Sequence, residues 1–179
     1  MDVSPAKAME QAMKEHYLMF AAYNVWANDI LYNAVAKLSD EQYRKDCGAF
    51  FGSVHGTLNH LLVGDIIWMH RFDGKGEPLK VLDMILHEDF DALLAARKIM
   101  DERIIDYAHS LDEATLAASF SYRTIVNPEE ITQPLSPALA QFFNHQTHHR
   151  GQVHSLLTRL AGEAPSLDLL YYLRENMGS

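Results

Sequence analysis

Hydrophobic residues recur every three or four positions along four long stretches of the chain, with polar residues between them. This spacing places the apolar side chains on one face of an α-helix. We predict a first helix over about residues 7–38, a second from the capping residue Ser53 to about Phe72, and a third over about residues 87–110. The fourth begins at Ser136-Pro137 and ends at Ala161-Gly162. Ser at the N-cap, Pro in the first turn and Gly just past the end are typical helix start and stop signals.

The connections carry their own signals. Ser39-Asp40-Glu41-Gln42 has the spacing of a capping box, so a short helical turn is expected there, followed by a loop over residues 46–52. Residues 120, 122, 124 and 126 alternate as a strand does before the turn at Asn127-Pro128, which predicts a small hairpin or extended crossover. A last amphipathic piece over residues 167–173 is expected to cover one end of the bundle. The economical arrangement is an all-α four-helix bundle with this long crossover before the last long helix.

Bulk properties limit the classes of function. The 179 residues are most economically one domain, with 48% hydrophobic and 22% charged residues, as in ordinary globular proteins. A formal net charge of −9 argues against nucleic acid as a partner, because phosphate binding needs a basic surface. The single cysteine, Cys47, excludes an internal disulfide framework. We find neither a membrane span nor a secretory signal at the polar N-terminus, so a cytoplasmic location is expected.

Two histidines on the fourth predicted helix form the main candidate site. His149 lies on the apolar stripe, and His145 precedes it by four residues, so both imidazoles can point at one atom. His60, on the second predicted helix, is a third candidate ligand. Three neutral imidazoles from two facing helices would hold a divalent transition metal and leave one coordination position open. The alternative is that these histidines only pack in the core, since the chain has ten histidines and chance pairs at this spacing are common.

His60 lies on the same side of its predicted helix as two glycines, Gly56 one turn before it and Gly64 one turn after it. Each glycine inside a helix costs about 1 kcal/mol relative to alanine. Their presence indicates that some group approaches this face closely. Helix–helix packing alone would also explain them.

Three further polar residues have two possible roles each. Asn24 lies on the buried face of the first helix and either bonds a neighbouring backbone group or supports a site. Asp65 either orients a ligand imidazole or is a polar break in the helix face. Arg150 either holds an anionic substrate group or forms a surface or interhelix ion pair.

Several other chemistries lack their motifs. The second histidine of a zincin motif is missing after His87-Glu88, and no Glu is placed three residues before a His as a di-iron bundle requires. We find no glycine-rich phosphate loop and no serine nucleophile elbow. Histidines rather than carboxylates dominate the candidate site. This favours zinc or nickel over magnesium or calcium.

The segment Asn144-His145-Gln146-Thr147-His148-His149-Arg150-Gly151-Gln152 resembles the signature of the DinB/YfiT-like family of metal-binding four-helix bundles. Thr57-Leu58-Asn59-His60-Leu61-Leu62, with Trp68 after it, resembles the second-helix motif of that family, and Tyr23-Asn24-Val25-Trp26-Ala27-Asn28 resembles its first-helix motif. The resemblance spans nearly the whole chain, so residues 1–179 are expected to form one such domain. It implies a metal held by three histidines, which fall on His60, His145 and His149.

The resemblance also implies candidate functions. Relatives of this type include transferases and isomerases that use a low-molecular-weight thiol such as bacillithiol, mycothiol or glutathione. Our leading hypothesis is a metal-dependent, thiol-dependent S-transferase acting on a small electrophile, because a metal can deprotonate a thiol at neutral pH. The alternatives are a metal-dependent hydrolase and a non-catalytic metal- or ligand-binding dimeric bundle with a stress-related role. A homodimer is expected in each case.

Overall fold

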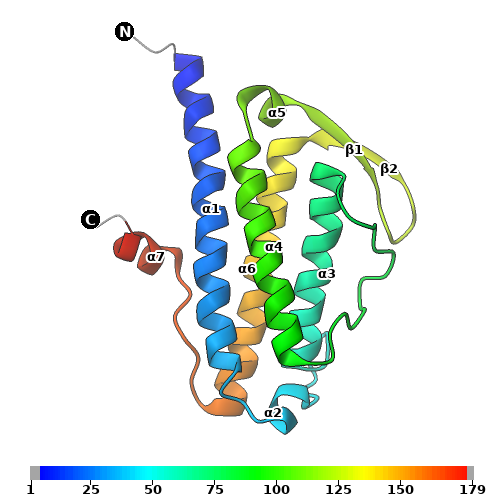
Figure 1. Cartoon of the computed structure of the whole chain (residues 1–179), viewed down its shortest axis with the longest axis vertical. Helices are drawn as coiled ribbons and strands as arrows, with labels where there is room; N and C mark the ends of the chain where they lie inside the picture. Colours follow the sequence, from blue (N-terminus) through cyan, green and yellow to red (C-terminus); the bar gives the residue numbers. More distant parts are fainter. Residues whose placement is uncertain (1–4, 177–179) are drawn as a thin grey trace.

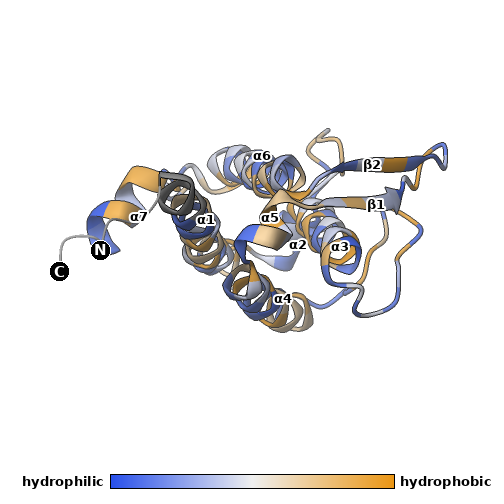
Figure 2. Ribbon diagram, turned by 90° about the horizontal axis from the view of Figure 1, so that it is seen from above, coloured by the Kyte–Doolittle hydropathy of each residue, from blue (hydrophilic) through white to orange (hydrophobic). Residues whose placement is uncertain are grey.

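Four long helices form the body of the protein, whose computed structural model describes residues 5–176 (Figure 1). They are α1 (Pro5–Val35), α3 (Val54–Asp73), α4 (Phe90–Ser110) and α6 (Leu135–Ala161). Viewed from above, α1 and α3 each pack against both α4 and α6, so the four helices surround one core (Figure 2). The predicted all-α four-helix bundle is confirmed. The polar start of the chain, residues 1–4, lies outside the described residues.

The core is built from the apolar stripes that the sequence predicts. Its most deeply buried members come from all four long helices and include Leu31, Leu58, Leu62, Leu93, Ile104, Leu139 and Phe142. Burying each such side chain stabilises the fold by about 1.5–3 kcal/mol. No helix among the described residues is long and apolar enough to cross a membrane.

The positions at which the helices begin and end are determined by local hydrogen bonds rather than by the extent of the apolar stripes. Ser39 and Gln42 form the predicted capping box at α2 (Asp40–Arg44), and Ser53 caps α3 by accepting a hydrogen bond from the Gly56 amide at 3.1 Å. The first helix ends at Val35 rather than near residue 38, because the backbone after Val35 forms the i→i+3 hydrogen bonds of a 3₁₀ turn. The third helix begins at Phe90 rather than 87, because the Asp89 carboxylate caps the Ala92 amide at 2.9 Å.

The crossover before the last long helix contains the predicted hairpin. Strands β1 (Ser119–Arg123) and β2 (Glu130–Pro134) pair antiparallel, with Tyr122 opposite Ile131. The strand β1 ends at Arg123, although the alternating pattern that predicts it continues in the sequence to Val126. A five-residue helix that the sequence did not predict, α5 (Glu113–Ala117), precedes the hairpin and is capped by Asp112.

Two expectations about the last third of the chain are wrong. Ser136 does not cap the fourth helix, because β2 runs directly into α6 and the Ser136 hydroxyl lies 2.7 Å from the Tyr17 hydroxyl instead. The C-terminal helix α7 (Leu169–Asn176) does not cover an end of the bundle. It lies along the side of α1, where Tyr172 packs against Tyr23 and Trp26 (Figure 1). The predicted end of α6 at Gly162, in left-handed conformation at φ +81°, is confirmed.

Candidate metal centre

Three histidines from α3 and α6 converge at one point of the bundle. One nitrogen from each of His60, His145 and His149 lies within 4.8 Å of the other two, and the Nε2 atoms of His145 and His149 are 3.0 Å apart. His60 and His149 are buried and His145 is half-buried. The structure therefore brings together the three residues selected from the sequence. Within the described part of the chain, no other group of three His, Cys, Asp or Glu residues converges in this way.

Glycine at position 64 makes this convergence possible. A Cβ atom at Gly64 would lie 2.7 Å from Cε1 of His145, far inside van der Waals contact. The His145 imidazole of α6 thus packs directly against the backbone of α3 at Gly64. Gly56, on the other side of His60, faces a different neighbour, since a Cβ there would lie 2.1 Å from the Phe51 carbonyl oxygen. The close approach predicted from the two glycines is confirmed at both.

Hydrogen bonds fix which nitrogen of two imidazoles faces the cluster. Nδ1 of His60 lies 2.7 Å from the Leu82 carbonyl oxygen, which only accepts, so Nδ1 carries the proton and donates it. Nδ1 of His149 lies 2.8 Å from Oε1 of Gln152, whose amide nitrogen faces His148 at 3.2 Å. In both neutral rings the lone pair is therefore on Nε2. Such a partner at the far nitrogen is the usual arrangement for a metal-binding histidine.

Burial keeps the three imidazoles neutral. It lowers the pKa of His145 to about 3, helped by the nearby His149, and lowers the pKa of His149 to about 4 against the opposing effect of the hydrogen bond that this ring donates to Gln152. Burial also lowers the pKa of His60, while its hydrogen bond to Leu82 opposes this. Neutral imidazole is the form that donates a lone pair to a metal.

Phe51 forms one wall of the cluster, and the sequence did not single it out. Its ring stacks on the His60 imidazole with centroids 3.7 Å apart and planes inclined by 17°, and its edge approaches His149 with centroids 5.6 Å apart. Phe51 belongs to the loop before α3. A loop aromatic carries no periodic signal, so only the tight turn at Gly52 and Ser53 could have drawn attention to it.

The donor set fits a divalent transition metal. Nitrogen ligands at about 2.0–2.1 Å from a tetrahedral metal lie about 3.3 Å apart, close to the 3.0 Å between His145 and His149. The buried Nδ1 of His145 has no hydrogen-bond partner among the described residues. A cluster of three neutral imidazoles, two of them held by hydrogen bonds at the far nitrogen, could bind such a metal.

A buried polar network next to the cluster ties the four long helices together. Asp65, one residue after Gly64, pairs with Arg97 and accepts a hydrogen bond from Nε2 of Gln146 at 3.1 Å. Gln146 follows His145, so this bond fixes α6 against α3 beside the cluster. Arg97 also lies 3.0 Å from Oδ1 of Asp101. The suggestion that Asp65 orients a ligand imidazole is wrong, because its partners are an arginine and an amide.

The same network explains Asn24 and Arg150. Both are buried, and Arg150 donates to Oδ1 of Asn24 while Nδ2 of Asn24 donates to Asp101 at 3.1 Å. Asn28 donates to Asp101 in the same way at 3.0 Å. Asn24 therefore binds side chains rather than a neighbouring backbone group. The prediction that Arg150 forms an ion pair is wrong. Its closest partners are amide and hydroxyl oxygens, including Oγ1 of Thr147 at 3.4 Å.

Fold and site together define a four-helix bundle with a three-histidine cluster that could bind a metal. The model of the DinB family matches residues 9–177, so the chain belongs to the DinB family. Protein DinB of Bacillus subtilis (strain 168) is 25% identical over 166 residues, covering 84% of this chain and 90% of that protein. The crystal structure of a DinB-like protein from Bacillus cereus ATCC 10987 superimposes with a TM-score of 0.57 at 20% identity, covering 82% of this chain and 94% of that one.

Proposed function

We propose that His60, His145 and His149 hold a divalent transition metal, zinc or nickel, and that the protein is a metal-dependent enzyme. The observation that carries this proposal is the convergence of three neutral imidazole nitrogens within 4.8 Å of one another. Three protein ligands leave a further coordination position open, which is the arrangement of catalytic rather than structural zinc sites. Membership of the DinB family and the intact histidine pattern add support.

The reaction that we propose is thiol-dependent S-transfer to a small electrophile. When bound, the metal supplies a Lewis acid that lowers the pKa of a small-molecule thiol. The thiol loses its proton to solvent, its sulfur forms a bond to carbon of the electrophile, and the leaving group departs with the electron pair of the broken bond.

The protein's own residues position the site for this reaction. The Leu82 carbonyl and Gln152 hold the rings of His60 and His149 in place. Phe51 covers one face of His60 and excludes water on that side.

Rates with a panel of low-molecular-weight thiols and electrophiles test this proposal. We expect measurable transfer by metal-loaded protein, loss of at least 100-fold in the His60→Ala variant, and no change in the control variant His154→Ala, whose imidazole lies outside the cluster. Equal rates for wild type and His60→Ala would overturn it. Hydrolysis of ester substrates without thiol, lost in the same variant, would assign the site to a metal-dependent hydrolase instead.

The second candidate is a non-catalytic metal- or ligand-binding dimeric bundle with a stress-related role. The observation that favours it is the Phe51 ring, which covers part of the space beside His60. Stoichiometric metal binding without activity on either substrate panel would support this candidate.

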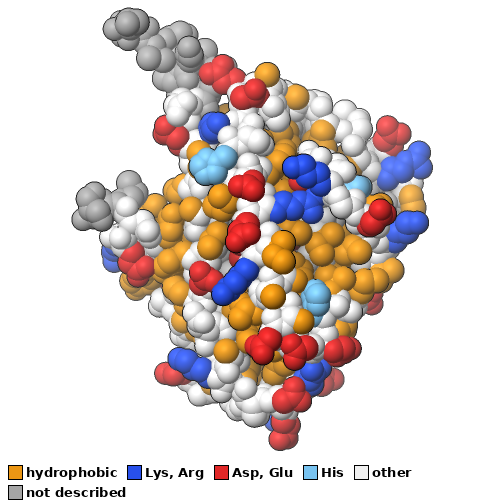
Figure 3. Space-filling model, viewed as in Figure 1, with side chains coloured by type: hydrophobic (Ala, Val, Ile, Leu, Met, Phe, Trp, Pro, Cys, Tyr) orange, Lys and Arg blue, Asp and Glu red, His pale blue; other side chains and the backbone are white. Residues whose placement is uncertain are grey.

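We also propose a homodimer. Large hydrophobic side chains are exposed both on the connection between α3 and α4 and on α7, namely Val81, Met84, Ile85, Leu170 and Tyr171. On the face drawn in Figure 3, a group of hydrophobic side chains lies to the right of centre between scattered charged ones. Exposed groups of this kind mark interaction surfaces. Light scattering coupled to gel filtration distinguishes a dimer from the 20.3 kDa monomer.

A further inference from the structure

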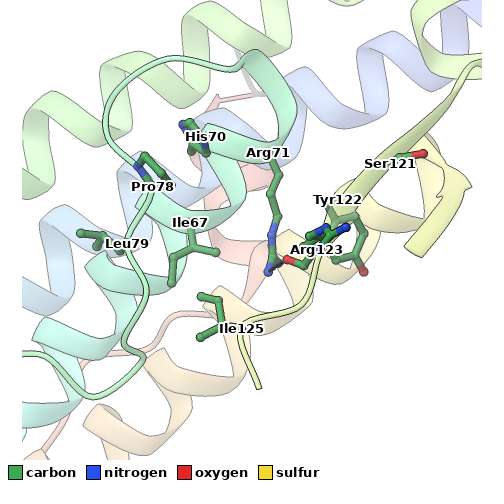
Figure 4. Close-up of a pocket in the computed structure, with 9 residues that line it drawn as sticks. All are labelled: Ile67, His70, Arg71, Pro78, Leu79, Ser121, Tyr122, Arg123 and Ile125. Carbon is green, nitrogen blue, oxygen red and sulfur yellow. Dashed lines mark hydrogen bonds between the residues drawn. The ribbon is translucent and has the colours of Figure 1, made fainter. Parts of the chain in front are cut away.

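A second polar site lies along α3 from the histidine cluster. A pocket of about 320 Å³ opens between the C-terminal half of α3, the connection that follows it, and β1 (Figure 4). Its size is at the lower end of the range for small-molecule sites. The apolar side of the pocket comes from Ile67, Leu79 and Ile125, and its polar side comes from His70 and the two arginines Arg71 and Arg123.

The Arg71 guanidinium is held in place without a carboxylate partner. It lies over the Trp68 ring at 4.7 Å and over the Tyr122 ring at 4.5 Å, so two aromatic faces fix its plane. One of its nitrogens donates to the Arg123 carbonyl oxygen at 3.2 Å. Among the described residues it forms no ion pair. Burial lowers the pKa of Arg71, and no carboxylate counteracts this effect.

This concentration of positive groups is unusual for a chain of net charge −9. The residues that line the pocket include two arginines and a histidine but no aspartate or glutamate. Two other buried or half-buried arginines have carboxylate partners, Arg97 with Asp65 and Arg103 with Asp73 at 2.7 Å, and the buried Arg150 donates to the amide oxygen of Asn24. A half-buried guanidinium with free donors is therefore left without an anion, and its planar fork matches a carboxylate.

The pocket and the histidine cluster share one face of α3. Gly64, Ile67 and Arg71 follow His60 by four, seven and eleven residues, which returns each to within about 40° of the same direction around the helix. Arg71 stands about 16 Å further along the axis, from the rise of about 1.5 Å per residue. The connection that supplies Leu79 to the pocket also supplies the Leu82 carbonyl that binds His60. The pocket and the histidine cluster therefore lie along one face of α3 and share the connection that follows this helix.

We infer that this pocket binds a small organic molecule that carries a carboxylate on an apolar body, with the carboxylate on the Arg71 guanidinium and the apolar part against Ile67, Leu79 and Ile125. As a binding site, the pocket stands on its own geometry. Its assignment to the non-reacting, acidic end of the substrate rests on the function proposed above.

The matched probes 3-phenylpropanoate and 3-phenylpropanamide test the pocket, since they differ only in the acidic group. The dissociation constant is measured by NMR titration of the Trp68 indole proton, in a Trp26→Phe background that leaves a single tryptophan. We expect the acid to bind at least ten-fold more tightly than the amide. Arg71→Gln removes this preference, and Arg71→Lys, which keeps the charge but not the fork, restores part of it. The control Arg174→Gln, on α7, leaves it unchanged.

Equal affinity for acid and amide, or an unchanged preference in Arg71→Gln, would overturn the inference. Tighter binding of phenyl phosphate than of the carboxylate would also overturn it, by assigning the pocket to phosphate esters. The titrations are repeated on His60→Ala protein, where the acid preference must persist because the pocket does not include that residue. If only the proposed function is wrong, the protein shows no metal-dependent activity but still prefers the acid. If only this inference is wrong, the protein shows metal-dependent activity but no preference for the acid.

Discussion

The substitution Gly64→Ala tests whether the bare backbone of α3 exists to receive the His145 imidazole. The added Cβ would lie 2.7 Å from Cε1 of His145, whereas ordinary contact begins at 3.4 Å. The ring must therefore retreat by about 0.7 Å, which exceeds the tolerance of about 0.2 Å for a metal–ligand distance. Because the imidazole is the end of a rotatable side chain, it can swing away and the protein still folds. We expect metal affinity to fall at least ten-fold, about 1.4 kcal/mol.

Gly151→Ala is the matched control. Gly151 also lies inside a long helix, and a Cβ there would meet nothing within 4 Å. Replacing an unconstrained helical glycine by alanine stabilises a protein by about 0.5–1 kcal/mol. We expect this gain in Gly151→Ala, with unchanged metal affinity, and little or no gain in Gly64→Ala.

Competition with a chromophoric chelator measures the metal affinity, and urea denaturation of metal-free protein measures the stability. The reasoning is refuted if Gly64→Ala binds metal as tightly as wild type and gains as much stability as Gly151→Ala. That result would mean that no close contact requires a glycine at position 64.

Three further predictions concern the surroundings of the cluster. Arg97→Met should destabilise the protein by about 3–5 kcal/mol in urea denaturation, because it leaves two buried carboxylates without their cation; a loss below 1 kcal/mol would contradict this. Since burial depresses the pKa values of His145 and His149 to about 3 and 4, the unfolding free energy of metal-free protein should fall as pH drops from about 6.5 towards 4, and replacing either by Gln should flatten that slope. Phe51→Ala should remove the stacked ring from His60 and speed metal release at least ten-fold in stopped-flow chelation; unchanged rates would show that the ring does not restrict access.

The sequence predicts the bundle well because helical periodicity is a local property repeated over many residues. Four apolar stripes are each long enough to fix a helix and the face that it buries. Helix ends are less certain where the stripe continues past the last hydrogen bond, as Leu38 does beyond Val35. The short helix α5 has too few residues for a periodic pattern.

The candidate site is predictable to the extent that its chemistry resides in side-chain types. His145 and His149 are neighbours on one helix face by spacing alone, and glycines one turn either side of His60 indicate a close approach. The sequence does not reveal which group approaches: the His145 ring lies over Gly64, and a backbone carbonyl lies over Gly56. The carbonyl oxygen of Leu82, which binds His60, has no signature, because every residue has one.

The buried charges show a different limit. The sequence predicts separate roles for Asp65 and Arg150, because it shows each residue only beside the neighbours on its own helix. The structure places them in one network that also includes Asn24, Arg97 and Asp101. The pairs in this network join residues 32 to 126 positions apart, with the exception of Arg97 and Asp101. Such pairing depends on how the helices are rotated against one another, which periodicity alone does not determine.

The most direct test of the proposed metal site is the metal content of protein purified without a histidine tag. Inductively coupled plasma mass spectrometry should find about one zinc or nickel per chain in wild type and in the control His154→Ala, and little in each of His60→Ala, His145→Ala and His149→Ala. Wild-type protein that retains no metal after incubation with either ion, or three variants that retain as much as wild type, would contradict the central claim.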